Sequence, residues 1–258
     1  MRYLTIENAK TTKGESLGYL TGILYLAPAD EAARAGYDVK NACPFASAGC
    51  KSACLFTAGR GAFPKIRAAR IRKSVELMGG RNWNQRPNAQ AAAHLADDIA
   101  ALIRKAKREK LIPAVRLNGT SDYPVHKWEI MEQFPDVQFY DYTKDIQKFL
   151  AFTRGELPKN YHLTFSRSES NALNTQGALE AGGLVAMVFD TVPKKYMGRR
   201  VLDGDESDLT FTRGKGILGL KAKGKARKDA SNFVIKTDGT KSTLPPARSK
   251  ESIIACES

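Results

Sequence analysis

The chain has 258 residues, of which 42% are hydrophobic and 26% are charged. These proportions are ordinary for a soluble globular protein, and a chain of this length buries a large core without disulfides or metals to staple it. Apolar runs such as Gly183 to Phe189 are too short to span a bilayer, and the polar start of the chain lacks the apolar segment of a secretory signal. We therefore expect a cytoplasmic protein with no membrane segment, in which residues 1–258 form a single domain.

The balance of charges is strongly basic. Lysine and arginine total 41 against 27 acidic residues, which gives a formal net charge of +14. Such a charge attracts polyanions and releases their counterions on contact. No nucleic-acid-binding motif accompanies it, so contact with nucleic acid is expected to be non-specific and steeply dependent on salt. A basic, soluble surface without a specific partner is the alternative interpretation.

The first predicted elements flank a segment that contains cysteines. A strand is expected around Leu20–Leu26. A helix follows from Pro64, with apolar residues on one face, and the Gly79-Gly80 pair ends it. A longer helix begins after Asn88, a favourable N-cap, and carries a sustained apolar stripe from Ala92 to Ala106.

After Pro113, strands and helices alternate. Short, nearly continuous apolar runs predict buried strands, and the stretches between them predict helices. The strands are expected at Ala114–Asn118, Gln138–Tyr142, His162–Ser166 and Leu184–Phe189, and the helices at Val125–Phe134, Ile146–Phe152 and Ala172–Ala181. This alternation indicates an α/β fold with a parallel sheet. Four such units and the N-terminal strand suggest a complete or partial βα barrel of the TIM type, and an open doubly wound sheet is the alternative.

The regular pattern fades after Pro193. The stretch from Arg213 to Lys228 is rich in glycine and lysine and holds seven basic residues. A solvated loop is expected here, and an anion-binding loop is the alternative.

All four cysteines of the chain are candidate ligands of an iron–sulfur cluster. Cys43, Cys50 and Cys54 form a C-x6-C-x3-C arrangement, and Cys256 is third from the end. Four thiolates complete the ligand shell of a [4Fe–4S] cubane. The small residues between the first three cysteines leave room for a compact inorganic core, and Lys51 and nearby bases can offset its negative charge. The pattern therefore predicts a [4Fe–4S] cluster held by these four residues.

Other uses of the cysteines are less well matched to the spacing. Structural zinc sites use short C-x2-4-C knuckles in pairs, and C-x6-C-x3-C is not one of them. Disulfides are not expected in a cytoplasmic chain. Zinc, or no metal at all, stays as the alternative. The role of Cys256 is the least constrained, because a near-terminal cysteine can also be free.

The cysteine segment and the loops after two of the expected strands resemble a known family. Cys43-Pro44 to Cys54, Asn118-Gly119-Thr120-Ser121-Asp122 and Phe165-Ser166-Arg167-Ser168-Glu169 are similar to the phage gene product 88 family, over about Leu20 to Cys256. The resemblance implies a phage-encoded iron–sulfur protein of the host cytoplasm, with an esterase-like activity on a small-molecule ester. In outline such proteins are similar to radical SAM enzymes, with a βα-barrel-like body and a cluster near its mouth.

The sequence departs from radical SAM enzymes at the cysteines. Their usual motif is C-x3-C-x2-C, and the spacing here is longer at both steps. They also leave one iron open for SAM, whereas no iron is open if Cys256 fills the fourth position. Two rival functions follow from these differences. One is a radical-SAM-like or electron-transfer protein, and the other is a basic nucleic-acid-binding phage factor in which the cluster is structural.

Catalytic candidates lie where the expected strands end, because the reactive groups of βα barrels sit on the loops at that edge. Hydroxyl nucleophiles, a base and cationic groups at such an edge can perform acyl transfer. Polar residues at these positions also cap helices, so a structural role is the alternative for each of them. The candidates are Ser121, Asp122, His126, Lys144, Ser166 and Arg167.

Overall fold

The computed structural model describes residues 2–6, 9–79 and 87–237. Its strands form a nine-stranded sheet in the order β1-β2-β3-β4-β5-β6-β9-β8-β7. Strands β2 to β6, β9 and β8 run parallel, whereas β1 and β7 pair antiparallel with β2 and β8 at the two edges. The strands are β1 (Leu4–Thr5), β2 (Tyr19–Leu24), β3 (Ile112–Arg116), β4 (Gln138–Thr143), β5 (Tyr161–Ser166), β6 (Leu184–Phe189), β7 (Lys195–Tyr196), β8 (Arg199–Asp203) and β9 (Gly216–Lys221).

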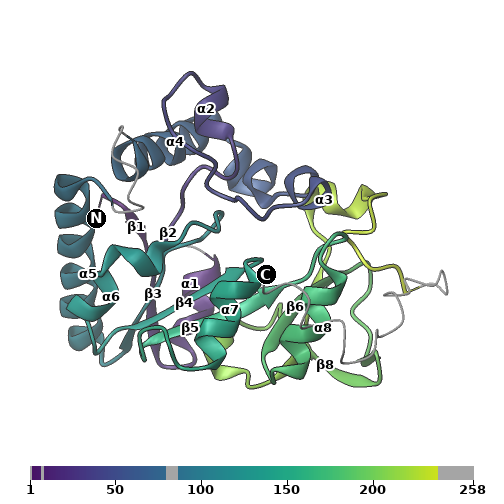
Figure 1. Cartoon of the computed structure of the whole chain (residues 1–258). Coiled ribbons are helices and arrows are strands. Elements are labelled where there is room, and N and C mark those ends of the chain that lie inside the picture. Colours follow the sequence, from purple (N-terminus) through teal and green to yellow (C-terminus); the bar gives the residue numbers. More distant parts are fainter. Residues whose placement is uncertain (1, 7–8, 80–86, 238–258) are drawn as a thin grey trace, which may run out of the picture.

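Helices that connect the parallel strands pack along the sheet. Helix α5 lies against β2 and β3, α7 against β4 and β5, and α8 against β5 and β6 (Figure 1). The α-helices are α1 (Ala9–Glu15), α2 (Glu31–Arg34), α3 (Ala48–Ser52), α4 (Pro64–Met78), α5 (Ala89–Glu109), α6 (Ile130–Gln133), α7 (Ile146–Thr153) and α8 (Ala172–Glu180). The 3-10 turns are η1 (Leu55–Thr57), η2 (Gly59–Ala62), η3 (Val125–Trp128), η4 (Thr210–Thr212) and η5 (Gly224–Lys228). None of these described helices is both long enough and apolar enough to cross a membrane.

Alternate side chains of each strand point to opposite faces of the sheet. On β4, Phe139 belongs to the large core that the helices cover, whereas Tyr140 packs with Leu209 in a separate cluster. Helix α1 contacts β2 and η4 contacts β5. Burial of both faces explains why the parallel strands read as nearly continuous apolar runs.

A buried ion pair ties the segment before η4 to β3. Arg116 Nη1 donates to both carboxylate oxygens of Asp208, at 2.9 and 3.1 Å. The guanidinium also lies 4.6 Å from the centre of the Tyr142 ring. Both charged side chains are nearly buried, so their pairing offsets the cost of taking each out of water.

Most of the predicted helices and strands are confirmed, with small shifts. Helix α4 ends at Gly79, and Asn88 caps α5 by accepting from two backbone N–H groups of its first turn. Strand β3 begins and ends two residues earlier than predicted. The predicted helix Val125–Phe134 is instead the turn η3 followed by the short α6. Glu129 separates them, because its φ of 55° lies in the left-handed region, which a helix cannot continue through.

Closure into a barrel is not confirmed. Strands β1 and β7 stand at the two ends of the strand order, and among the described residues no pairing joins them. Both are antiparallel to their neighbours and so occupy the edges that a parallel barrel would have to close. Strands β2 to β6 follow one another in chain order, and beyond β6 the order reverses through β9, β8 and β7. The architecture is an open, mixed α/β sheet.

The region after Pro193 is more ordered than its composition suggests. The expected solvated loop from Arg213 to Lys228 contains strand β9, which pairs with β6 on one side and β8 on the other. The apolar run Gly216-Ile217-Leu218-Gly219-Leu220 forms this strand, and Ile217 and Leu218 are fully buried. The loop prediction was therefore wrong for Gly216–Lys221, because the flanking glycines and lysines masked a short buried strand.

Candidate functional site

The segment between β2 and α5 lies over the carboxyl edge of the parallel strands (Figure 1). It carries Cys43, Cys50 in α3, and Cys54 immediately before η1. Cys43 Sγ accepts a hydrogen bond from the backbone N–H of Ala29 at 3.3 Å, and it lies 3.9 Å from the carbonyl oxygen of Thr120. Because Ala29 follows β2 and Thr120 follows β3, these contacts place Cys43 at the edge where the two strands end.

Glu169, which follows β5, holds the second part of the cysteine segment. Its carboxylate accepts from Ser47 Oγ at 2.8 Å and from the backbone N–H of Gly49 at 2.7 Å. Ser47 Oγ in turn accepts from the backbone N–H of Cys50 at 3.1 Å, as the N-cap of α3. The carboxylate therefore fixes α3, and Cys50 with it, to the end of β5. Glu169 belongs to the motif Phe165-Ser166-Arg167-Ser168-Glu169 but is not among the predicted catalytic residues.

Gly49 is required by this close packing. A Cβ atom at this position would collide with Ser231 Oγ, and it would lie 2.8 Å from both Glu169 Oε2 and Phe233 Cβ. Any larger residue would push α3 away from the segment that covers it. The glycine in the cysteine motif is thus explained by contact with residues more than 100 positions away in the chain.

The three cysteines of this segment form no disulfide among the described residues, and they influence one another electrostatically. Burial raises the pKa of Cys43 to about 12, with smaller contributions in the same direction from the charges of Asp122 and Cys50. Burial also raises the pKa of Cys54, where Cys50 again adds to the shift and Arg70 and Lys144 oppose it. Cys50 therefore lies within electrostatic reach of both neighbours. Without a cationic partner, the buried thiols stay protonated.

The last described part of the chain covers the cysteine segment. Phe233 and Val234 pack with Ala53, and Cys50 borders this cluster. Arg167 Nη1 donates to the carbonyl oxygens of residues 232 and 233 at 2.6 and 2.7 Å, which fixes the cover to the end of β5. The guanidinium of this predicted catalytic residue is therefore engaged in a structural contact.

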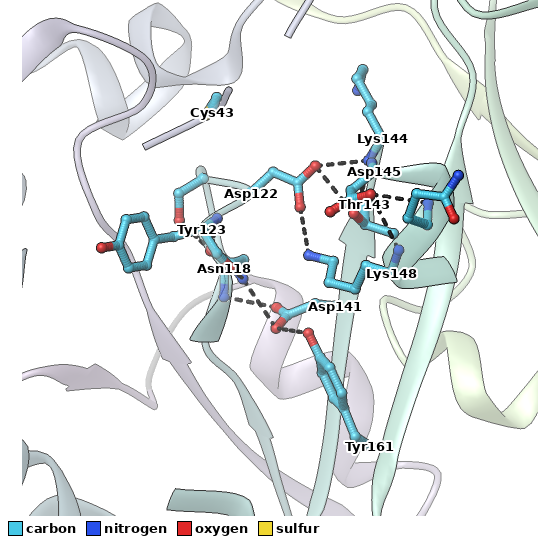
Figure 2. Close-up of polar contacts among 12 residues, drawn as sticks. Cys43, Asn118, Asp122, Tyr123, Asp141, Thr143, Lys144, Asp145, Lys148 and Tyr161 are labelled. Atoms are coloured by element: carbon cyan, nitrogen blue, oxygen red, sulfur yellow. Dashed lines mark hydrogen bonds and ion pairs between the residues drawn. The ribbon is translucent and has the colours of Figure 1, made fainter. Parts of the chain in front are cut away.

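Asp122 is the centre of a polar network at the same edge (Figure 2). Its Oδ1 pairs with Lys148 Nζ of α7 at 2.9 Å, and its Oδ2 accepts from the backbone N–H of Lys144 at 2.7 Å and from Thr143 Oγ1 at 3.2 Å. Burial alone would raise the pKa of Asp122, but the Lys148 charge and the backbone donor outweigh it and hold the pKa below its usual range. Asp122 is thus a carboxylate at neutral pH. Lys148, which is not among the predicted catalytic residues, is its buried counter-charge.

Lys144 and Ser166 form a direct pair. Lys144 Nζ donates to Ser166 Oγ at 2.8 Å, from the end of β4 to the end of β5. The ammonium group lies 5.9 Å from the centre of the Phe233 ring and is close enough to Cys54 to lower the pKa of that thiol. Among the six predicted catalytic residues, these two present a nucleophile and a basic group within hydrogen-bond reach of each other.

Ser121 supports a buried network rather than facing the Lys144–Ser166 pair. Its hydroxyl donates to Asn118 Oδ1 at 2.7 Å, and the amide and backbone N–H of Asn118 donate to Asp141. The hydroxyl of Tyr161 also donates to Asp141, at 3.1 Å (Figure 2). Burial raises the pKa of Asp141 to about 6, although these donors and the charge of Arg116 oppose the shift. This network fixes the loop after β3 that carries Asp122.

His126 lies on η3, beyond the loop that contains Asp122. Burial lowers the pKa of His126 to about 4, and the charges of Lys148 and Lys127 act in the same direction. Its Nδ1 is buried and has no hydrogen-bond partner among the described residues. The imidazole is therefore neutral at physiological pH, and no contact joins it to Ser166.

A G-x-S-x-G sequence is present from Gly14 to Gly18, but its position differs from that of a hydrolase nucleophile. It ends helix α1 and precedes β2, whereas the nucleophile elbow follows a strand and begins a helix. Ser16 Oγ donates to the carbonyl oxygen of Lys13. This match is therefore not the elbow of an α/β-hydrolase.

No group of three or more His, Cys, Asp or Glu side chains within the described ranges converges as a single metal ion would require. Cys256 lies outside the described residues. The chain is last described at Thr237, whose N–H and hydroxyl donate to Asp190 at the carboxyl end of β6. The described chain thus ends at the edge that carries the other three cysteines.

The open α/β sheet and the thiols gathered over its carboxyl edge define an α/β protein with a cysteine-bearing strand-end site. Residues 2–237 match the model of the family described as Gene product 88. The chain belongs to this family of phage gene products. No curated protein and no solved structure matches it.

Proposed function

We propose that this protein is a [4Fe–4S] protein that hydrolyses carboxylic esters, with Ser166 as nucleophile and Lys144 as general base. The observation that carries the hydrolase is the 2.8 Å hydrogen bond between Lys144 Nζ and Ser166 Oγ at the carboxyl edge of the sheet. A serine paired with a lysine is one of the recurring variants of the activated nucleophile.

The donor set fits an iron–sulfur cluster. Three cysteines that form no disulfide in the described structure come from one segment. Burial disfavours the thiolate form of Cys43 and Cys54 unless a cation such as iron displaces the proton. The N–H of Ala29 points at Cys43 Sγ, and backbone donors to sulfur are a usual feature of such sites. A cubane spreads its ligands over four iron corners, so its thiols need not converge on one point as they do around a single ion.

The fourth ligand of this proposal is Cys256. It follows Thr237 by 19 residues, and an extended chain of that length spans about 60 Å. Reach therefore does not limit its return to the strand ends. When bound, a cluster with four thiolates supplies a covalent link between the cysteine segment and the end of the chain, together with a one-electron redox centre, and it leaves no iron open to substrate.

The proposed hydrolysis uses the side chains alone. Lys144 first gives the proton of its ammonium group to water, and the resulting amine then accepts the hydroxyl proton of Ser166 as Ser166 Oγ bonds to the ester carbonyl carbon. The tetrahedral adduct collapses, the bond to the leaving oxygen breaks, and Lys144 returns the proton to the alcohol. Water then attacks the acyl-serine while Lys144 accepts one of its protons. Collapse of this second adduct releases the acid and returns the proton to Ser166.

Asp122 and Lys148 act as positioning residues in this proposal. Asp122 holds the backbone N–H of Lys144, and Lys148 neutralises Asp122 without reaching Ser166 by any described contact. The fixed backbone directs the Lys144 side chain from β4 toward β5. Removing this support is expected to lower turnover by loosening Lys144, not by removing a reacting group.

The cluster is tested by iron and sulfide content and by the absorption spectrum of anaerobically purified protein. Single serine variants of Cys43, Cys50, Cys54 and Cys256 are each expected to lose the cluster or change its spectrum. Ser52→Ala is the control, because Ser52 is an exposed residue of α3, and this variant should keep the iron content of the wild type. A Cys256→Ser variant with a full, unchanged cluster would refute closure by four thiolates and favour the radical-SAM-like alternative. Wild-type protein without bound iron would refute the cluster.

The hydrolase is tested with a short-chain aryl ester. Ser166→Ala and Lys144→Met should each lower turnover on the order of a hundredfold or more, and a fluorophosphonate should label Ser166 as judged by peptide mass. Ser170→Ala is the control, because Ser170 is exposed on the loop that follows β5, four residues after Ser166. Cluster content is measured in every variant. Losses below threefold in both site variants at full cluster content would refute the Lys144–Ser166 assignment.

A further inference from the structure

Two basic segments that are far apart in the sequence meet beside the cysteine segment. Turn η5 contacts η1, and a Cβ atom on Gly224 would lie 2.8 Å from Cβ of Ala58. Turn η2 in turn contacts both η1 and the start of α4. In Figure 1 the yellow end of the described chain lies next to α3. We call the exposed residues of this surface the basic patch: Arg60, Lys65, Lys225, Arg227 and Lys228, with the apolar Leu55, Phe63 and Ile66.

The patch combines cations with exposed apolar side chains. Leu55, Phe63 and Ile66 are 47%, 59% and 39% exposed, although side chains of this size are usually covered. On the other segment, Ala222 and Ala226 are buried against the cysteine segment and act as anchors. The basic residues around them point outward to solvent: Lys221, Lys223, Lys225, Arg227 and Lys228.

The cations of the basic patch lack acidic partners within the described part of the chain. Neighbouring bases are paired, namely Lys51 with Asp30 and Lys223 with Asp205. Among the described residues, no ion pair involves any of the five patch cations, whereas the nearby Arg67 pairs with Glu31. The first turn of α4, at which Phe63 and Lys65 sit, also has no acidic residue to offset its positive end. Within the described residues, the patch therefore carries positive charge that no ion pair offsets.

We propose that the basic patch binds single-stranded nucleic acid without reading its sequence. Phosphates complement the five cations of the patch, and the exposed ring of Phe63 offers a face on which an unpaired base stacks. Leu55 and Ile66 extend the apolar surface beside that ring. A duplex keeps its bases stacked inside, so it would use the charges but not the apolar centre. The proposal is independent of the hydrolase, because no patch residue contacts Lys144 or Ser166 in the described structure.

Binding is measured by fluorescence anisotropy with the full-length protein and labelled oligo-dT of about 20 nucleotides. Five phosphate contacts predict a slope of about −3.5 in a plot of log affinity against log salt, so affinity falls about a hundredfold between 50 and 200 mM salt. An oligo-dA of equal length should bind within a few-fold of oligo-dT. A duplex of equal length should bind at least fivefold more weakly than either strand.

Charge-neutralising variants locate the site. The triple change K225Q/R227Q/K228Q should weaken binding at least tenfold and reduce the salt slope by about 2. The matched control R104Q/K107Q/R108Q removes the same charge from exposed positions on α5, away from the patch, and should change affinity less than threefold. The pair R60Q/K65Q tests the other segment and is expected to act in the same direction. Phe63→Ala should weaken single-strand binding more than duplex binding, whereas Leu173→Ala, an equally exposed apolar site on α8, should do neither.

Thermal melts and ester turnover accompany each variant, so that loss of folding or of hydrolysis is separated from loss of binding. Equal losses of affinity in the patch triple variant and the control triple variant would overturn the proposal, because binding would then depend only on the net charge of the chain and not on the patch. Binding to an acidic polypeptide such as polyglutamate in preference to oligo-dT would also overturn it and assign the surface to a protein partner. If Ser166→Ala keeps full ester turnover, the proposed hydrolase is refuted, but the conclusion about nucleic-acid binding stands.

Discussion

Removal of the Lys148 ammonium from Asp122 should be the most destabilising single change at the carboxyl edge. In Lys148→Met the apolar stem keeps its packing, but Asp122 Oδ1 loses its described partner at 2.9 Å. The lysine side chain is only 3% exposed and the aspartate 12%, so water replaces the lost contact poorly. A buried carboxylate left without its counter-charge costs about 3 kcal/mol, at the lower end of the usual range because two donors to Oδ2 remain.

The loss should depend on pH in a defined direction. In the wild type the pKa of Asp122 is held below its usual range, so the stability it contributes is present above about pH 4 and is lost as pH falls further. Without Lys148, burial dominates and the pKa of Asp122 rises, so acid neutralises the buried charge. The difference between the two proteins should therefore be largest at pH 7 and shrink towards pH 4.

Chemical denaturation at pH 7, 5.5 and 4 measures this prediction. The double variant D122N/K148M should lose about 2 kcal/mol less than the sum of the two single variants, because the second change removes the unpaired partner. Arg154→Met is the control, since its ion pair with Glu156 is on the surface, and it should leave the denaturation midpoint unchanged. A loss below about 1 kcal/mol in Lys148→Met, with no dependence on pH, would show that the pair is hydrated and would refute the reasoning.

Three further predictions concern the supports of the site. Glu169→Gln should lower the free energy of unfolding by about 1.5–3 kcal/mol and speed proteolysis within α3, because a neutral amide replaces the charged acceptor of Ser47 and Gly49. Equal cleavage rates in the variant and the wild type would contradict the role of Glu169 in fixing α3. Gly49→Ala should cost about 1–3 kcal/mol through its collision with Ser231, whereas Gly177→Ala, where an added Cβ meets nothing, should be neutral or stabilising in the same unfolding assay. Asp141 carries a pKa of about 6 that burial raises, so its share of the unfolding free energy should grow as pH falls from 7 to 4.5; Asp141→Asn should remove that part of the pH slope, and an unchanged slope would contradict it.

Short-range sequence patterns were sufficient to predict the helices and strands that have a clear cap residue or a continuous apolar run. Asn88 caps α5 as expected, and the apolar run Leu184–Phe189 is strand β6 with the same bounds. These patterns did not predict short elements whose conformation depends on residues far away in the sequence. Strand β9 was hidden by the glycines and lysines around it, and its partners β6 and β8 decide its conformation. The break in the helix at Glu129 likewise could not be predicted from neighbouring residues, because a left-handed conformation is uncommon for a residue other than glycine.

The same division holds for the candidate site. The strand-end rule selected Asp122, Lys144 and Ser166, and the structure joins them through direct contacts and shared backbone. It did not select Lys148, because a position within a helix carries no signal until its partner is known. Glu169 lies at a strand end but was not chosen as a catalytic candidate, and its contact with α3 cannot be read from the sequence. Iron binding and ester hydrolysis at this site both stay predictions.

The sequence by itself determined the alternation of strands and helices, the positions of the cysteines and the basic balance of charge, since these are properties of composition and short-range pattern. Only the tertiary structure decided whether the sheet closes, which polar groups meet, and which side chains are left exposed. Sheet closure depends on how the first and last strands pair, and β1 and β7 both pair antiparallel at open edges. The contacts of Gly49 with Ser231 and Phe233, and of η5 with η1, join segments that are more than 150 residues apart. No local pattern encodes such contacts, because they arise only when the whole chain buries its apolar faces together.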